Sequence, residues 1–278
     1  MWRERALLFR EIGREGGEYL STPSGIVSKL CPRLDPAELL AAGRLVKDSR
    51  TVTAGINGGY FIKRYNRKSL WNSLKRVFQL PRAKRCLAGA LKLEKAGIPT
   101  PHVLYADRSF LVTESLGGSM EEFSLCVHRE WTMDFVPTLV KMHEEGIFHG
   151  DLSLRNIYRT KEGFFGLIDL DSVVLYPGKV PLRRQIGEMA RLVSSYCLLS
   201  RIADAEGALE NFLKKHEEAG GPVLPREKVL KKVRYYIGKT DMRWLKDVSD
   251  PEKTGEEKKH LMKHPGKGEV FHDRNPSS

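Results

Sequence analysis

The sequence lacks any long uninterrupted run of apolar residues. No stretch of its 278 residues approaches the roughly 18 apolar positions that a membrane-spanning helix requires. The apolar start, Ala6–Phe9, ends too early for the core of a secretory signal. Cysteine is also scarce, and the four residues lie far apart without metal-ligand spacing: Cys31, Cys86, Cys126 and Cys197. We therefore expect a cytoplasmic protein with reduced cysteines.

Acidic side chains are absent from Tyr60–Leu93, a segment that carries ten Lys or Arg residues. This segment supplies most of the formal net charge of +12. A basic surface of this kind attracts nucleic acid, an anionic membrane or a phosphorylated glycan. A solvated face that only aids solubility has the same composition, so charge alone does not separate these alternatives.

Apolar periodicity and turn residues divide the chain into a first part rich in strands and a second part rich in helices. Expected strands cover 45–47, 51–56, 60–65, 103–106, 110–113, 157–159 and 164–168. Expected helices cover 36–43, 69–78, 81–96, 131–146, 186–197, 203–218 and 226–236.

This order of elements predicts an α+β chain with two lobes. The small β-rich lobe is expected at residues 1–115, with a basic insertion at 66–85, and the helical lobe at 116–248. Residues 249–278 are rich in Lys, Glu, Gly and Pro, and we expect them to form a disordered charged tail.

The polar residues Asp151, Asn156 and Asp169 are the strongest functional signal in the sequence. Asn156 follows Asp151 by five positions, and Asp169 comes directly after the apolar strand 164–168. Because a turn joins the strands 157–159 and 164–168, the hairpin brings Asp169 back beside the other two residues. Two carboxylates and an amide oxygen at one place suit magnesium-assisted phosphoryl transfer. We predict that Asp151 is the catalytic base and that Asn156 and Asp169 hold Mg²⁺.

The stretch His149–Asn156 reads H-G-D-L-x-x-x-N and resembles the catalytic loop of the protein-kinase-like superfamily. The resemblance implies ATP and Mg²⁺ as cofactors, with the nucleotide between the lobes. Lys63 then matches the strand lysine that neutralises the α- and β-phosphates. The connector from Glu114 to Leu116 is expected to contact the nucleotide through its backbone.

Further segments are similar to the lipopolysaccharide kinase family over about residues 45–200. Besides the catalytic loop, they are Tyr60–Asn66, Arg82–Arg85, Ala96–Pro101 and Leu167–Asp171. Members of this family phosphorylate Kdo or heptose in the inner core of bacterial lipopolysaccharide. The resemblance implies an ATP-dependent kinase whose acceptor is a sugar hydroxyl on an anionic glycolipid.

The resemblance also gives the basic segment a role at the inner face of the plasma membrane. Its cations would attract the acceptor and the negative leaflet while Trp71, Leu74 and Phe78 rest against lipid. Packing of these three residues on the small lobe is the alternative. A nucleic-acid partner is not expected in this interpretation, and the oligomeric state stays open.

The partner of Lys63 departs from the kinase pattern. Cys86 or Arg85 occupies the position of the glutamate that normally pairs with the strand lysine. Glu94 comes one helical turn too late, so the sequence leaves the partner open. Asp171 is expected only to brace its loop.

Two more departures concern loops. There is no G-x-G-x-x-G loop, and the turn after the first strand of the 45–65 region is Lys47–Arg50. No A-P-E sequence follows Asp171, and Gly150 replaces the Arg of H-R-D. Control by activation-loop phosphorylation is therefore not expected, which favours a small-molecule or glycan kinase over an ordinary protein kinase.

Three alternatives stay open. A RIO-like atypical kinase of a tRNA-modification complex carries the same H-G-D-L-x-x-x-N loop, and a basic chain suits tRNA. Aminoglycoside-type phosphotransferases share H-G-D, but cationic drugs favour an acidic pocket. A pseudokinase that binds an anionic ligand without transferring phosphate would explain the missing glutamate and glycine loop.

Overall fold

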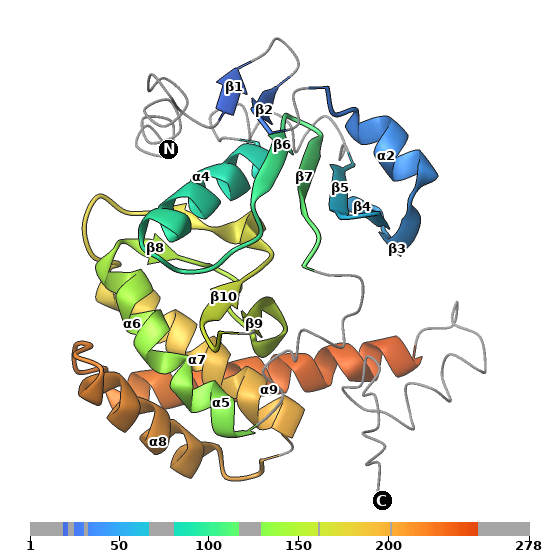
Figure 1. The fold of residues 1–278 in the computed structure, drawn as a ribbon. Coiled ribbons are helices and arrows are strands. Elements are labelled where there is room, and N and C mark those ends of the chain that lie inside the picture. Colours follow the sequence, from blue (N-terminus) through green and yellow to red (C-terminus); the bar gives the residue numbers. More distant parts are fainter. Residues whose placement is uncertain are drawn as a thin grey trace, which may run out of the picture.

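The computed structural model describes residues 19–21, 25–30, 33–66, 81–116, 129–160, 162–200 and 202–249. A twisted sheet flanked by helices lies at one end of the molecule, and a group of helices lies at the other (Figure 1). The expected two-lobed, kinase-like α+β fold is therefore confirmed. The helix expected at 69–78, most of the 66–85 insertion and the tail after 249 lie outside the described residues. Residues 117–128, which follow the expected connector, also lie outside them.

The sheet of the first lobe is antiparallel and has the order β1-β2-β6-β7-β5-β4-β3. Its strands are β1 (Tyr19–Ser21), β2 (Ile26–Ser28), β3 (Arg44–Asp48), β4 (Val52–Asn57), β5 (Tyr60–Tyr65), β6 (Val103–Ala106) and β7 (Phe110–Glu114). The sequence predicted the last five within one or two residues. It did not reveal β1 and β2, because three residues each are too few to show an alternating pattern.

Helices cover both faces of this sheet. Helix α2 (Pro36–Ala42) begins at Asp35, whose side chain accepts hydrogen bonds from two backbone amides, as the sequence predicts. Helix α4 (Arg82–Lys95) packs on the opposite face (Figure 1). Side chains alternate along β5, so Ile62 faces the α2 side while Lys63 and Tyr65 face the α4 side. The register of β5 therefore decides on which face of the sheet Lys63 lies.

The second lobe is helical. It contains α5 (Arg129–Asp134), α6 (Val136–Glu144), α7 (Leu182–Ser200), α8 (Ala205–Glu218) and α9 (Arg226–Ser249). The single helix expected at 131–146 is wrong: it breaks at Phe135 because Pro137 has no amide proton to donate to residue 133. Helix α9 also runs past Tyr236, where the sequence interpretation ended it.

Two short strand pairs lie between the sheet and the helices. Strands β9 (Ile157–Arg159) and β10 (Phe165–Leu167) form the expected hairpin, in which Leu167 is opposite Ile157. Strand β8 (Ile147–Phe148) pairs with β11 (Val174–Leu175). The two pairs frame the loops that carry the polar residues of the H-G-D motif and Asp169.

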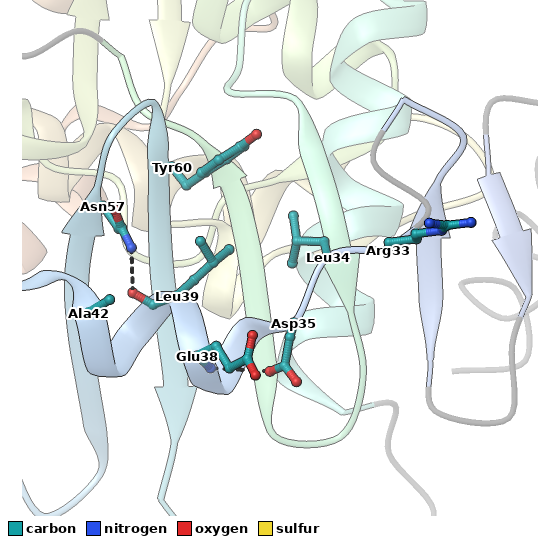
Figure 2. Close-up of a pocket in the computed structure, with 8 residues that line it drawn as sticks. All are labelled: Arg33, Leu34, Asp35, Glu38, Leu39, Ala42, Asn57 and Tyr60. Carbon is teal, nitrogen blue, oxygen red and sulfur yellow. Dashed lines mark hydrogen bonds between the residues drawn. The ribbon is translucent and has the colours of Figure 1, made fainter.

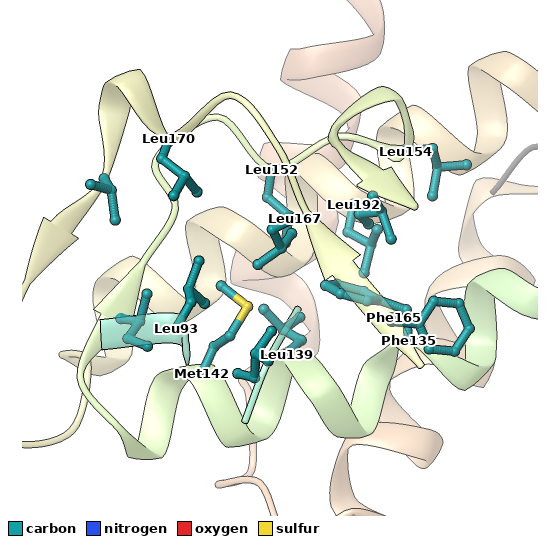
Figure 3. Packing of buried hydrophobic residues seen from close by; sticks show 14 of the residues in the cluster. Leu93, Phe135, Leu139, Met142, Leu152, Leu154, Phe165, Leu167, Leu170 and Leu192 are labelled. Carbon is teal, nitrogen blue, oxygen red and sulfur yellow. The ribbon is translucent and has the colours of Figure 1, made fainter. Parts of the chain in front are cut away.

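Buried leucines anchor these loops from below. Leu152 and Leu154, which follow Asp151, are fully buried. Leu167, two residues before Asp169, is also fully buried, and Leu170, directly after Asp169, is 6% exposed (Figure 3). Each such side chain contributes about 1.5–3 kcal/mol by leaving water. The apolar residues fix the loop backbone, and the polar residues between them are left at the surface of the lobe.

Candidate active site

The catalytic loop is folded around Asp151 and Asn156. The side-chain amide of Asn156 donates to the Asp151 carbonyl oxygen over 2.9 Å. The backbone amide of Leu154 donates to the Ser195 hydroxyl over 3.0 Å, which ties the loop to α7. Since the Asn156 nitrogen is used in this bond, its amide oxygen is directed away and stays available to a cation.

A buried carboxylate supports the same loop from α7. Glu188 is fully buried; one of its oxygens accepts from the Gly150 amide over 2.6 Å, and the other lies 2.9 Å from His143 Nε2. A charge without water is stable only when its oxygens are paired in this way. Glu188 therefore fixes the backbone one residue before Asp151.

Gly150 allows the catalytic loop to approach the loop that follows β10. Its φ is +83°, and an added Cβ would collide with the carbonyl oxygen of Ser172. The position that carries Arg in H-R-D kinases is thus occupied here by the one residue type that fits. The two loops can touch because this side chain is missing.

Asp169 is brought beside Asn156, as the hairpin predicts. The amide of Ile168 donates to the Asn156 carbonyl oxygen over 3.0 Å, and His149 Nε2 lies 2.9 Å from the Ile168 carbonyl oxygen. Among the described residues, Asp169 is the only non-glycine residue with positive φ, at 57°. Strained backbone of this kind is concentrated at functional sites.

Lys63 reaches across from the first lobe to this loop. Its Nζ lies 2.7 Å from Asp169 Oδ1 and 3.4 Å from Asp171 Oδ1. Burial alone would lower the pKa of Lys63, but the two carboxylates outweigh burial and raise it above the ordinary value. Lys63 is therefore a buried, fully charged ammonium group at neutral pH.

Asp171, which the sequence suggested only as a brace for its loop, contacts three side chains of the first lobe. Besides Lys63, its Oδ1 accepts from the Tyr65 hydroxyl over 2.7 Å and from the Cys86 thiol over 3.3 Å. Burial acts to raise the pKa of Asp171, yet Lys63 and these two donors keep it below the ordinary value. Cys86, one of the two residues expected at the glutamate position, is a buried thiol whose pKa burial raises.

Arg191 is a site residue that the sequence did not reveal. Its Nη1 lies 2.8 Å from Asp151 Oδ1, and its guanidinium group stacks 4.8 Å from the ring centre of Tyr236. Arg191 is on α7 and Tyr236 on α9, and both are far from the motif in sequence. Only the helical spacing of α7, with buried residues on its inner face, could have pointed to a basic side chain directed at the loop.

The connector residues Glu114 and Leu116 lie at the end of β7. The Glu114 amide already donates to the His102 carbonyl oxygen over 3.0 Å, and the neighbouring Ser115 amide donates to the Gly59 carbonyl oxygen over 2.7 Å. Contact of the Glu114–Leu116 backbone with a nucleotide stays a prediction.

The donor set fits magnesium when phosphate oxygens complete it. No group of three or more His, Cys, Asp or Glu side chains in the described part of the chain could hold a metal ion. Mg²⁺ usually needs fewer, because one or two carboxylates suffice when nucleotide phosphates and water supply the other oxygens. The carboxylate of Asp169 and the amide oxygen of Asn156 meet this requirement.

A groove of about 550 Å³ lies elsewhere, on the outer face of the sheet beside α2 (Figure 2). Asn57 closes one side, where its amide donates to the Leu39 carbonyl oxygen over 3.1 Å. Tyr60 lines the groove from β5, on the sheet face opposite Lys63. The groove is therefore separate from the residues of the candidate active site.

Two further expectations concern the cysteines and membrane-spanning helices. Cys86 and Cys197 are free thiols, while Cys31 and Cys126 lie outside the described residues. No helix in the described ranges has the length and apolarity needed to cross a membrane.

Comparison with known proteins identifies the family. The model of the lipopolysaccharide kinase (Kdo/WaaP) family matches residues 44–214, more than half of the chain. A search of the curated proteins finds no match. The matched range contains Lys63, Asp151, Asn156 and Asp169, which the fold brings to one place. The chain therefore belongs to the lipopolysaccharide kinase family, whose members are phosphotransferases acting on the lipopolysaccharide core.

Proposed function

We propose that the protein transfers the terminal phosphoryl group of ATP to a Kdo or heptose hydroxyl of the lipopolysaccharide inner core. One observation carries this proposal: Lys63, from the first lobe, meets Asp169 at 2.7 Å, on the loop that adjoins Asp151 and Asn156. Phosphoryl transfer needs cations at the phosphates and an oriented hydroxyl. These four side chains supply both.

The residues divide the work between them. Lys63 neutralises nucleotide phosphates, and Asp169 and Asn156 hold the metal by their oxygens. Mg²⁺, when bound, would screen the charge that develops on the transferring group. Asp151, with 58% of its side chain exposed, orients the acceptor hydroxyl and takes its proton.

Arg191 adds a positive charge next to the base. Its side chain is 36% exposed and uses Nη1 for Asp151, and the guanidinium group has further N–H donors besides this one. A phosphorylated or carboxylated sugar carries anionic groups near its hydroxyls, and a cation here favours such an acceptor over a cationic one. This supports a glycan acceptor rather than an aminoglycoside.

The basic segment would attract the acceptor at the inner face of the plasma membrane. Within it, Lys75 and Arg76 lie in the part outside the described residues. We expect Lys75→Glu/Arg76→Glu to weaken binding to anionic vesicles and to slow turnover of a lipid-bound acceptor. Turnover of a lipid-free core oligosaccharide serves as the control and should change much less. Equal vesicle binding and equal turnover in the variant would exclude this role.

An acceptor panel tests the proposal itself. The purified protein is offered ATP and Mg²⁺ with lipid A–core acceptors, with proteins of the tRNA-modification complex and with aminoglycosides in parallel. Mass spectrometry should show one added phosphate on a Kdo or heptose of the core acceptor alone. Phosphate on one of the other substrates would contradict the proposal. ATP hydrolysis that adds phosphate to none of the acceptors would contradict it as well.

A further inference from the structure

The buried carboxylate beside Lys63 comes from a different element here than in protein kinases. A lysine side chain is a point charge on a flexible stem, so it needs an anion to hold it. In protein kinases, a glutamate on the helix beside the sheet supplies this anion. Here that helix is α4, and its side chain in contact with Asp171 is the neutral thiol of Cys86.

Asp171 satisfies the same requirement from the loop that follows β10. Its Oδ1 lies 3.4 Å from Lys63 Nζ and is held by two further donors, Tyr65 at 2.7 Å and Cys86 at 3.3 Å. Only 19% of the Asp171 side chain is exposed, whereas Asp169 is 44% exposed. Asp169 is thus open to a metal, while Asp171 is enclosed by protein donors.

The packing of α4 explains why the exchange is possible. Gly89 lies one turn after Cys86, and a Cβ on Gly89 would lie 2.8 Å from Val173 Cγ1. Small side chains at both positions let α4 come close to the loop that carries Asp171. A glutamate at position 86 and an aspartate at position 171 would compete for the same space.

We propose that Asp171 is the positioning residue for Lys63 and that it replaces the helix glutamate, with Cys86 as a neutral donor to it. The lysine is then aimed by the same loop that carries the metal ligand Asp169, rather than by a movable helix. This inference rests on the proposed role of Lys63 in nucleotide binding.

The first test compares Asp171→Asn with wild type by measuring the dissociation constant of ATP in the presence of Mg²⁺. We expect ATP to bind at least about 10-fold more weakly, the effect of losing one charge–charge contact in a buried site. Wild-type affinity for ATP in Asp171→Asn would overturn the inference.

The second test moves the carboxylate back to the helix. Asp171→Ala alone should bind ATP weakly, and Cys86→Glu added to it should restore most of the affinity. Cys86→Gln in the same background is the matched control: it has the same size without the charge and should restore little. Equal affinities of the Glu and Gln double variants would overturn the inference, because a residue that only braces the loop would not be replaced by a charge on α4.

A milder change covers the case in which these variants do not fold. Tyr65→Phe removes one donor to Asp171 and keeps the ring, and it should weaken ATP binding two- to fivefold. Unchanged affinity in Tyr65→Phe would then overturn the inference. Failure of wild type to bind ATP is a different result, because it overturns the nucleotide site itself.

Discussion

Asp151 is held from two sides at the scale of the single residue. Asn156 fixes its backbone carbonyl, and Arg191 pairs with one carboxylate oxygen at 2.8 Å. Because these contacts fix the carboxyl group of Asp151, they also fix the direction of its second oxygen. A base in this position acts through its orientation, because a hydroxyl proton is transferred only when donor and acceptor are aligned.

Replacement of Asp151, the proposed base, should separate chemistry from binding. In Asp151→Asn the side chain keeps its shape but cannot accept the proton. We expect kcat to fall by about 10²-fold or more, while ATP affinity stays near that of wild type. Single-turnover phosphate transfer and ATP titration measure the two quantities. Undiminished kcat in the variant would refute the assignment of the base.

Arg191 should affect turnover through Asp151. Arg191→Met removes the ion pair, and we expect kcat to fall by about 10-fold, the order of magnitude that mispositioning of a catalytic group produces. ATP affinity should stay the same, since Arg191 forms no ion pair or hydrogen bond with Lys63 or Asp169 among the described residues. Arg183→Met, on an exposed position of the same helix, is the control. Equal kcat in the two variants would show that the ion pair is incidental.

The loops that carry the site depend on close backbone approach at the scale of the element. Gly150 has space for no side chain because Ser172 lies against it, and this contact joins the catalytic loop to the metal loop. Leu152 and Leu170 anchor the two loops in the core beneath. The two loops are thus positioned by the absence of a side chain at Gly150, where they touch, and by the buried leucines on the core side.

Gly150→Ala tests the contact between the loops. Strained φ and the collision with Ser172 should lower the free energy of unfolding by about 1–3 kcal/mol and reduce phosphate transfer. Gly58→Ala is the matched control, because Gly58 also has positive φ but open space around its Cβ position. It should cost about 1 kcal/mol with activity retained. If both variants lost equal stability and kept activity, the loop contact would not matter.

Most of the order of strands and helices could be predicted from the sequence, because each element depends on residues close together in the chain. The short strands β1, β2, β8 and β11 and the break between α5 and α6 could not. Asn156 and Asp169 flank one strand-turn-strand unit, Asp151 lies five residues before Asn156, and their meeting follows from that hairpin. The contact of Asp171 with Cys86 joins residues 85 positions apart, and that of Asp151 with Arg191 joins residues 40 apart. Such contacts depend on how helices pack against loops, which no local pattern encodes.

Stability of the whole molecule should depend on a buried histidine pair between α6 and α8. Burial, followed by the nearby His143, lowers the pKa of His216 to about 4 from its ordinary 6.5. The unfolded chain therefore binds a proton more readily than the folded one between these values. Stability from the neutral imidazole is complete above pH 6.5 and is lost as pH falls towards 4.

Urea unfolding from pH 7 to pH 4 measures this linkage. We expect wild type to lose unfolding free energy with a slope of up to about 1.4 kcal/mol per pH unit from His216. His216→Phe keeps a ring of similar size without a titrating group, so its slope should be smaller by that amount. Parallel curves for the two proteins would show that His216 does not carry the effect.

The proposed phosphate transfer depends on the contact of Lys63 with Asp169, the proposed metal ligand, beside the loop of Asp151. The most direct measurement is ATP-dependent phosphate incorporation into a purified inner-core acceptor by wild type and by Asp169→Ala. Wild type should add one phosphate to a Kdo or heptose, and Asp169→Ala should add none above background although it remains folded. Equal incorporation by the two proteins, or none by wild type with any inner-core acceptor, would contradict the account.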